Sequence, residues 1–264
     1  MTKLPLHFAH ANSYPAGTYK QYFAHLRERF EIGALDMHGH DPRFPVEDGW
    51  RTLSAELIHQ LESYPEPVVL VGHSLGGMLS MMAAKKRPEL VRCVVMLDSP
   101  LVAGWRAMVW RLLKNSSWAD RYTPAKGSVR RRNVWPSREA AFEHFSRKDM
   151  FAAWAPGVLD DYLEHGLKPH PEGVQLRFTR EVETAVYRSL PHHLGKLLRE
   201  PYPVPIGFIG GTESVESRQA GLDATRALVG ENFMQVVGGH LFPMERPAVA
   251  AQATADMVSR LLLK

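Results

Sequence analysis

Residues 68–86 constrain the fold more than any other part of the chain. Four consecutive apolar residues, 68–71, lead directly into Gly-His-Ser-Leu-Gly at residues 72–76, and a helical pattern follows that Pro88 ends. A short apolar run is typical of a buried parallel strand. A serine between two glycines at such a strand-to-helix turn is typical of an exposed nucleophile, because larger side chains there would crowd the strand or the helix. The pattern therefore predicts that Ser74 is a nucleophile.

Apolar runs of strand length recur along the chain and alternate with helical patterns. The helical patterns include residues 78–86 and residues 248–263. The apolar runs lie at residues 4–8, 32–35, 68–71, 93–97, 206–209 and 233–237. Alternation of this kind predicts a doubly wound α/β sheet.

The alternation stops between residues 101 and 200, where helical patterns dominate. Ser137 is expected to cap a helix that reaches Phe145, and Gly166 to end another helix. An apolar stripe at helical spacing contains Trp105, Met108, Val109 and Leu112, with Arg106 and Lys114 away from it. The region also holds five of the six tryptophans, namely Trp105, Trp110, Trp118, Trp135 and Trp154. We therefore expect residues 1–100 and 201–264 to form a core and residues 101–200 an inserted helical cap.

Several further segments resemble the α/β-hydrolase family, and the resemblance extends over nearly the whole chain. Residues 8–12 resemble the family's oxyanion-hole loop, and residues 36–40 its Asp-x-x-Gly-His segment. Residues 239–247 resemble the loop that bears its catalytic histidine. Because residues 4–8 match the family's third strand, the first two strands have no counterpart. The resemblance implies a mainly parallel six-stranded sheet flanked by helices, with an inserted helical cap.

The chemistry of acyl transfer assigns roles to the residues around Ser74. A serine hydroxyl is a poor nucleophile at neutral pH, so it needs an adjacent base such as an imidazole. His240 follows the last predicted strand, in the Ser, acid, His order that this fold requires. The oxyanion needs N–H donors, which the resemblance places at Leu75 and Asn12, with Ala11 as the second register.

The acid is the position at which the chain departs from the family pattern. Most members carry it after the seventh strand, where this chain has Ser214, with Glu213 one residue before. A serine cannot carry the charge that stabilises an imidazolium. Another branch of the family carries its acid after the sixth strand, where Asp98 lies. We predict Asp98 as the acid, with Glu213 as the alternative; a turn-opening role would otherwise explain an aspartate before Ser-Pro.

These residues predict a serine hydrolase that cleaves a carboxylic ester or related acyl substrate and needs no cofactor. Thioesters, lactones and amides are cleaved by the same machinery. Cofactor-free haloperoxidases and lyases of the fold also keep the serine and remain alternatives, as does a non-catalytic ligand-binding member. Ser74 and His240 together favour an enzyme. Dehalogenases and epoxide hydrolases of the fold carry an aspartate where Ser74 stands.

Charge is distributed unevenly and bears on the expected partners. Residues 101–200 contain 17 of the 32 Lys and Arg residues but 11 of the 28 Asp and Glu residues. We therefore expect a positively charged mouth and an anionic or hydrophobic small-molecule acyl substrate. The alternative is that these charges are solvated and that the tryptophans only pack the cap onto the sheet. The basic run at residues 130–132 lacks any accompanying nucleic-acid motif, so no nucleic-acid binding is predicted. His38, His40 and Asp41 lack the spacing of a metallo-hydrolase site, so no metal is predicted.

Cysteine usage and hydropathy indicate the compartment. Cys93 is the single cysteine and lies in an apolar run, which favours a buried thiol in a reducing environment. The N-terminal residues are too short and interrupted for a signal-peptide core, and no apolar run reaches membrane-spanning length. We expect a cytoplasmic protein without membrane insertion.

Overall fold

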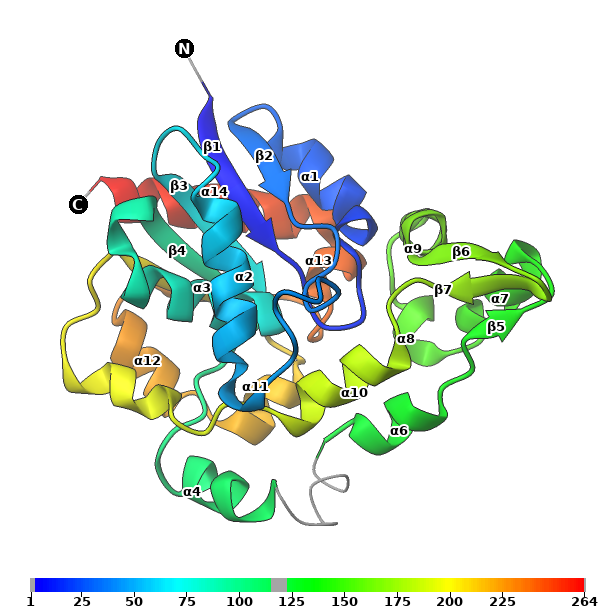
Figure 1. Cartoon of the computed structure of the whole chain (residues 1–264). Helices are drawn as coiled ribbons and strands as arrows, with labels where there is room; N and C mark the ends of the chain where they lie inside the picture. The colour runs from blue at the N-terminus through cyan, green and yellow to red at the C-terminus, as the bar shows by residue number, and fades with distance from the viewer. Residues whose placement is uncertain (1–2, 115–122, 264) are drawn as a thin grey trace.

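A six-stranded parallel sheet, with strand order β2-β1-β3-β4-β8-β9, forms the centre of the protein (Figure 1). The computed structural model describes residues 3–114 and 123–263. The strands are β1, Leu4–Ala9; β2, Phe30–Ala34; β3, Val68–His73; β4, Val91–Leu97; β8, Ile206–Gly211; and β9, Phe233–Val236. All neighbouring strands in this sheet pair in parallel, which confirms the predicted α/β fold.

Helices cover both faces of the sheet, and the side chains of each strand alternate between the two layers. On β3, Val69 and Val71 pack with α1 and α14, whereas Val68 and Leu70 pack with α2 and α3. Full burial of one such side chain contributes about 1.5–3 kcal/mol. The first layer contains α1, Lys20–Leu26, and α14, Pro247–Leu262. The second contains α2, Arg51–Leu61; α3, Leu75–Lys86; and α12, Asp223–Val229.

Shorter helices lie in the connections of the core. They are η1, Ala16–Tyr19; η2, Asp48–Trp50; η3, Pro88–Leu90; α11, Val215–Ala220; and α13, Phe242–Glu245. Within residues 3–114 and 123–263, no helix is long and apolar enough to cross a membrane.

Residues 101–200 leave the sheet after β4 and return to it at β8. They form α4, Gly104–Leu113; α6, Ala125–Arg130; β5, Val134–Trp135; α7, Arg138–Ser146; α8, Asp149–Ala152; α9, Val158–Gly166; β6, Leu167–His170; β7, Gly173–Leu176; α10, Arg180–Arg188; and η4, Leu194–Arg199. Figure 1 shows α7, α8, α9 and the three strands as a lobe beside the main sheet.

Besides the helices expected in this region, the insertion contains a small sheet that the sequence analysis did not predict. β5, β7 and β6 form a three-stranded antiparallel sheet. Its strands have two, four and four residues, too few to give a period-two pattern in the sequence. Gly173, at the start of β7, packs closely on the residues at the end of β5, since a Cβ at this position would lie 2.3 Å from Pro136 O.

The helix ends expected at Ser137 and Gly166 are confirmed. The apolar face of α4, in contrast, is largely exposed. The Ser137 side chain accepts the Ala140 N–H and caps α7, and α9 ends at Gly166. On α4, the side chains of Trp105, Met108 and Leu112 are 64%, 60% and 73% exposed. Periodicity identifies an apolar face, but it does not determine which element covers that face.

Candidate active site

Ser74 lies on the sharp turn between β3 and α3, in a strained backbone conformation. Its φ and ψ angles are 52° and −115°. A Cβ on Gly72 would lie 2.3 Å from the Gly76 backbone, and one on Gly76 would lie 2.0 Å from Ala9 O. The Ser74 N–H donates to Leu97 O at 2.9 Å, which ties the turn to β4. The sequence folds this way because only glycine fits at both close approaches.

His240 connects Ser74 with Asp98 through two hydrogen bonds. His240 Nε2 lies 3.0 Å from Ser74 Oγ, and Nδ1 lies 2.6 Å from Asp98 Oδ2. An ionised carboxylate only accepts, so Nδ1 carries the proton and Nε2 is left to accept the serine proton. Ser74 follows β3, Asp98 follows β4, and His240 lies between β9 and α13. The structure therefore brings together three residues from distant parts of the sequence.

Asp98 is fully buried and accepts four hydrogen bonds. Besides His240, its donors are Ser214 Oγ at 2.5 Å, Gly211 N at 2.9 Å and Ser217 Oγ at 3.0 Å. Burial raises the pKa of Asp98, but the hydrogen bonds from His240, Ser214 and Gly211 outweigh it and hold the pKa below its ordinary value. This carboxyl is therefore ionised at neutral pH.

The alternative acid, Glu213, is exposed and lines the cavity without reaching the histidine. Its backbone N–H donates to Gly238 O at 2.9 Å, and no hydrogen bond or ion pair joins its carboxylate to His240 in the described structure. Ser214, at the position where the family resemblance implies the acid, instead donates to Asp98. Its hydroxyl also accepts the Ser217 N–H at 3.0 Å and so caps α11.

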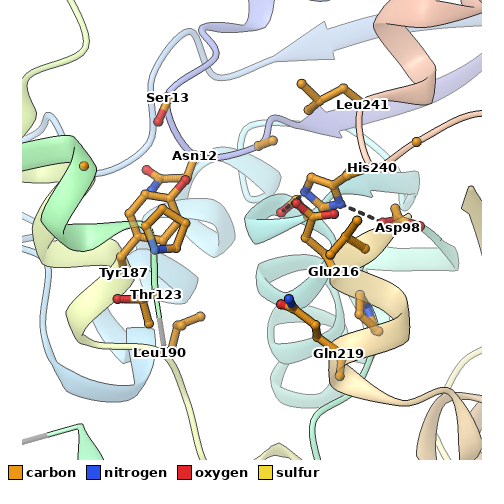
Figure 2. A pocket seen from close by; sticks show the side chains of 18 of the residues that line it. Asn12, Ser13, Asp98, Thr123, Tyr187, Leu190, Glu216, Gln219, His240 and Leu241 are labelled. Atoms are coloured by element: carbon orange, nitrogen blue, oxygen red, sulfur yellow. Dashed lines mark hydrogen bonds and ion pairs between the residues drawn. The ribbon is translucent and has the colours of Figure 1, made fainter. Parts of the chain in front are cut away.

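Carboxylates on several elements surround the imidazole of His240, whose side chain is 19% exposed. Burial lowers its pKa, but the hydrogen bond and charge of Asp98, together with the charges of Glu216 and Glu245, raise the pKa above its ordinary value. Figure 2 shows Glu216 on the same side of the cavity as His240, opposite Asn12. These groups therefore make His240 a stronger base than an ordinary imidazole.

Two of the three backbone N–H groups expected at an oxyanion hole are without a protein partner in the described residues. The Ala11 N–H donates to Tyr19 Oη at 3.1 Å and is therefore occupied. Neither the Asn12 N–H nor the Leu75 N–H has a hydrogen-bond partner among residues 3–114 and 123–263. The geometry favours Asn12 over Ala11 as the donor from this loop.

A hydrogen-bonded chain that the sequence did not reveal joins this loop to the His240 loop. The carbonyl of His240 only accepts, so His73 Nε2–H donates to it at 2.8 Å. His73 Nδ1 then accepts from Tyr19 Oη at 2.7 Å. Tyr19 in turn accepts the Ala11 N–H. Burial is the largest cause that lowers the pKa of His73, to about 3. A neutral His73 ring agrees with its donor and acceptor roles in this series of hydrogen bonds.

A cavity of about 1140 Å³ lies over Ser74 and is lined by both the core and the inserted segment. Trp105 and Trp110 line it, whereas Trp135 and Trp154 are buried elsewhere. Trp118 lies outside the described residues. The basic residues in the lining all come from residues 101–200 and are Arg106, Arg131 and Lys148. The acidic residues are Asp98, Glu213, Glu216 and Glu245 from the core and Glu183 from α10. Among the described lining residues, the positive charge that was expected at the mouth therefore comes from the inserted segment, and most of the negative charge comes from the core.

Several potential metal ligands are bonded to other protein atoms. Single atoms of Asp98, Glu216 and His240 lie within 4.8 Å of one another, but Asp98 and His240 bind each other. In the loop after β2, His38 Nδ1 lies 3.2 Å from Glu56 Oε2, and His40 Nε2 accepts the Thr179 N–H at 3.1 Å. These bonds give the loop a structural role.

Comparison with known proteins agrees with this geometry. The sequence model of the alpha/beta hydrolase family matches residues 8–253. The chain belongs to the alpha/beta hydrolase family. The solved structure of E-2-(acetamidomethylene)succinate hydrolase resembles this hydrolase-family chain with a TM-score of 0.77 and covers 97% of it, 91% of that chain being matched. The identity of 21% makes this a likeness of fold.

Curated relatives of this family member match it over part of their length. A type I acyl-CoA thioesterase, mpaH, from Penicillium roqueforti is 24% identical over 200 residues, which cover 67% of this chain and 44% of the relative. Lipase LipV from Mycobacterium tuberculosis is 31% identical over 163 residues, which cover 57% of this chain and 52% of the lipase. The chain therefore spans about half the length of these relatives.

Proposed function

We propose that the protein is a serine hydrolase, of the carboxylesterase kind, that cleaves a carboxylic ester or related acyl substrate through an acyl-enzyme on Ser74. The observation that carries the proposal is the hydrogen-bonded series from Ser74 through His240 to Asp98 beneath a large cavity. Family membership and relatives that are named a thioesterase and a lipase support the same class.

The geometry supports a two-step reaction. Ser74 Oγ attacks the acyl carbonyl while its proton passes to His240 Nε2, and Asp98 stabilises the imidazolium that forms. The N–H groups of Leu75 and Asn12 stabilise the oxyanion. The imidazolium then gives its proton to the leaving group. Water, activated by the neutral His240, attacks the acyl-enzyme, releases the acid and restores Ser74.

The cavity lining favours a small-molecule substrate with an extended apolar part. Its volume of about 1140 Å³ is large, and Trp105, Val109 and Trp110 of α4 contribute apolar surface to it. Thioester and lactone substrates fit the same proposal. The cytoplasmic location expected from the single cysteine stays a prediction.

Covalent labelling tests the proposal directly. A fluorophosphonate probe should label the wild-type protein and fail to label Ser74→Ala. Ser63→Ala, which alters an exposed serine outside the cavity lining, is the matched control and should be labelled like wild type. Equal labelling of Ser74→Ala would contradict the assignment of the nucleophile. No labelling of folded wild type would favour a ligand-binding member. A chain-length panel of esters and acyl thioesters then identifies the acyl group.

A further inference from the structure

Glu183, a buried carboxylate on α10, bonds directly to the loop that follows β1. Its Oε1 accepts from Ser13 Oγ at 2.5 Å, and its backbone carbonyl accepts from Asn12 Nδ2 at 3.2 Å. Asn12, Ser13 and Glu183 are only 6%, 4% and 5% exposed. The contact spans 170 residues of sequence and joins the inserted segment to the core.

Ser13 has a backbone conformation that needs support from its surroundings. Its φ angle is 77°, in the left-handed region that residues other than glycine seldom adopt. Such a conformation costs roughly 1 kcal/mol or more and persists where neighbouring contacts hold it. The Ser13 hydroxyl bond to Glu183 is a contact of this kind. This bond holds Ser13, the residue next to Asn12. The Asn12 N–H is the proposed oxyanion donor.

Glu183 is itself held in place by other residues of the inserted segment. Its Oε2 lies 2.8 Å from Arg131 Nη2, just after α6. Next to it, Thr184 Oγ1 lies 2.8 Å from Ser128 Oγ of α6. Burial raises the pKa of Glu183, whereas the charge of Arg131 and the hydrogen bond from Ser13 lower it. The position of the carboxylate is therefore set by how α6 and α10 pack together.

The two halves of the loop thus depend on different parts of the protein. Ala11 is held by the core, because its N–H donates to Tyr19 and its carbonyl accepts from His10 Nδ1 at 2.8 Å. Asn12 and Ser13 are held by α10. Figure 2 shows Asn12, Ser13 and Tyr187 of α10 together on one side of the cavity, with His240 on the other.

We propose that Glu183 is a positioning residue that fixes the Asn12–Ser13 turn, so that oxyanion stabilisation depends on the seating of α10 against the core. The proposal rests on the proposed hydrolase function. Glu183 acts through Ser13 and Asn12 and takes no part in proton transfer. Its loss should therefore raise the barrier of the chemical step more than it weakens substrate binding.

Two variants separate positioning from packing. Ser13→Ala removes the hydroxyl donor and leaves the Glu183–Arg131 ion pair intact. Glu183→Gln keeps the size of the side chain and an oxygen that can accept from Ser13. Removal of a whole oxyanion donor costs about 10²–10³ in kcat, so a loosened donor should cost on the order of 10-fold. We expect Ser13→Ala to lower kcat by this factor with KM nearly unchanged, and Glu183→Gln to be less impaired.

The matched control is Glu181→Gln, which alters an exposed carboxylate on the same helix outside the cavity lining. It should retain wild-type kcat. A transition-state analogue such as a trifluoromethyl ketone should lose affinity in Ser13→Ala by about the same factor as kcat. An unchanged kcat in Ser13→Ala, or a rise in KM alone, would overturn the proposal. If Ser74→Ala were as active as wild type, the hydrolase assignment itself would fail, which is a separate outcome.

Discussion

The core and the inserted segment hold their functional groups in different ways. Ser74, Asp98 and His240 lie at the ends of core elements, and Asp98 alone accepts four hydrogen bonds. The inserted segment instead lines the cavity and supplies all three of the basic residues found in the described lining. The difference agrees with the proposed function, in which the core carries the chemistry, and it leads us to propose that residues 101–200 select the substrate.

Apolar side chains show the same contrast. Every residue of β3 is buried, because helices cover both faces of the sheet. On α4, Trp105 is 64% exposed and Leu112 is 73% exposed. Trp105 also lines the cavity. The inserted segment therefore exposes apolar side chains that could contact a substrate, whereas all the side chains of the central strand β3 are buried.

Loss of the buried acid should have the largest effect. Asp98→Asn removes the charge that orients His240 and stabilises its cation, a change that lowers kcat by about 10⁴ in a serine protease. We expect a loss of this order in kcat for a poorly activated ester. Glu213→Gln should keep most of the activity, because Glu213 does not contact His240. Circular dichroism would verify that both variants are folded, and the reverse ranking would move the acid to the loop after β8.

The residues that the sequence predicted well are those marked by a local pattern. The strands appear as apolar runs, and the turn at Ser74 as two glycines at a fixed spacing. Asp98 and His240 each follow a strand, so the order along the chain was enough to place them at one edge of the sheet. The structure brings them within hydrogen-bond distance, and their catalytic roles stay predictions.

The residues that the sequence did not predict depend on contacts between distant segments. Glu183 looks like an ordinary polar position on a helix, and nothing near it in the sequence points to Ser13. Tyr19 and His73 are 54 residues apart and meet only after the sheet has formed. His73 lies inside the Gly-His-Ser-Leu-Gly segment, which was the one available signal for it.

Acid should destabilise the core through its buried histidines, His7, His10, His38 and His73. Burial is the largest cause that lowers their pKa values, to about 3 for His7, His38 and His73. Between pH 6.5 and 3 the unfolded chain therefore binds more protons, and stability falls as pH falls. Glu56 acts in the opposite direction between pH 7 and 4.5, because burial raises its pKa to about 7.

Each histidine that the fold keeps neutral should lower the free energy of unfolding by roughly 1 kcal/mol per pH unit as the pH falls below 6.5, so the net effect of these groups is a stability that falls from pH 7 to pH 5. Urea unfolding at pH 7, 6 and 5 measures this slope. His7→Gln should reduce this slope by the contribution of about one proton. His25→Gln, which alters an exposed residue of α1, is the control and should leave the slope unchanged. A stability that is independent of pH over this range would show that the histidines are not held neutral by the fold.

The pH dependence of turnover should report on His240. Its raised pKa predicts that kcat/KM falls on the acid side of a value above 6.5, because the protonated imidazole cannot act as a base. The groups that face it are Asp98 just after β4, Glu216 from α11, Glu245 from α13 and the neutral His73 from β3. Glu216→Gln should lower the apparent pKa, because it removes one of the charges that raise it.

Glu213→Gln is the matched control for this shift, since it removes a neighbouring cavity carboxylate that does not act on His240. It should leave the acid limb unchanged. An acid limb at or below pH 6.5 in wild type would contradict the assigned environment of the base. An equal shift in both variants would mean that the general field of the cavity, rather than Glu216, sets the pKa.

The smallest effect should come from the charge that residues 101–200 place at the rim of the cavity. Lys148 is exposed there, and its Nζ lies 5.1 Å from the centre of the Phe145 ring. Burial and the charge of Arg131 lower its pKa, so two cations lie near each other. Glu183 is the only described acidic residue from residues 101–200 in the lining, and it already binds Arg131. An acyl group with an anionic end should therefore gain from Lys148.

We expect Lys148→Gln to lower kcat/KM for an ester with a terminal carboxylate by roughly two- to five-fold, the size typical of an exposed ion pair. The neutral analogue of the same length should be hydrolysed as before. Salt should reduce the preference of wild type for the anionic ester and have little effect on the variant, because exposed charges are screened within about 10 Å at 0.1 M. Lys126→Gln, which alters an exposed lysine of α6 outside the lining, should behave as wild type. If wild type shows the same salt response with both esters, the basic residues of the inserted segment do not select the substrate, and the division between a core for chemistry and an insertion for selection would depend on its apolar lining alone.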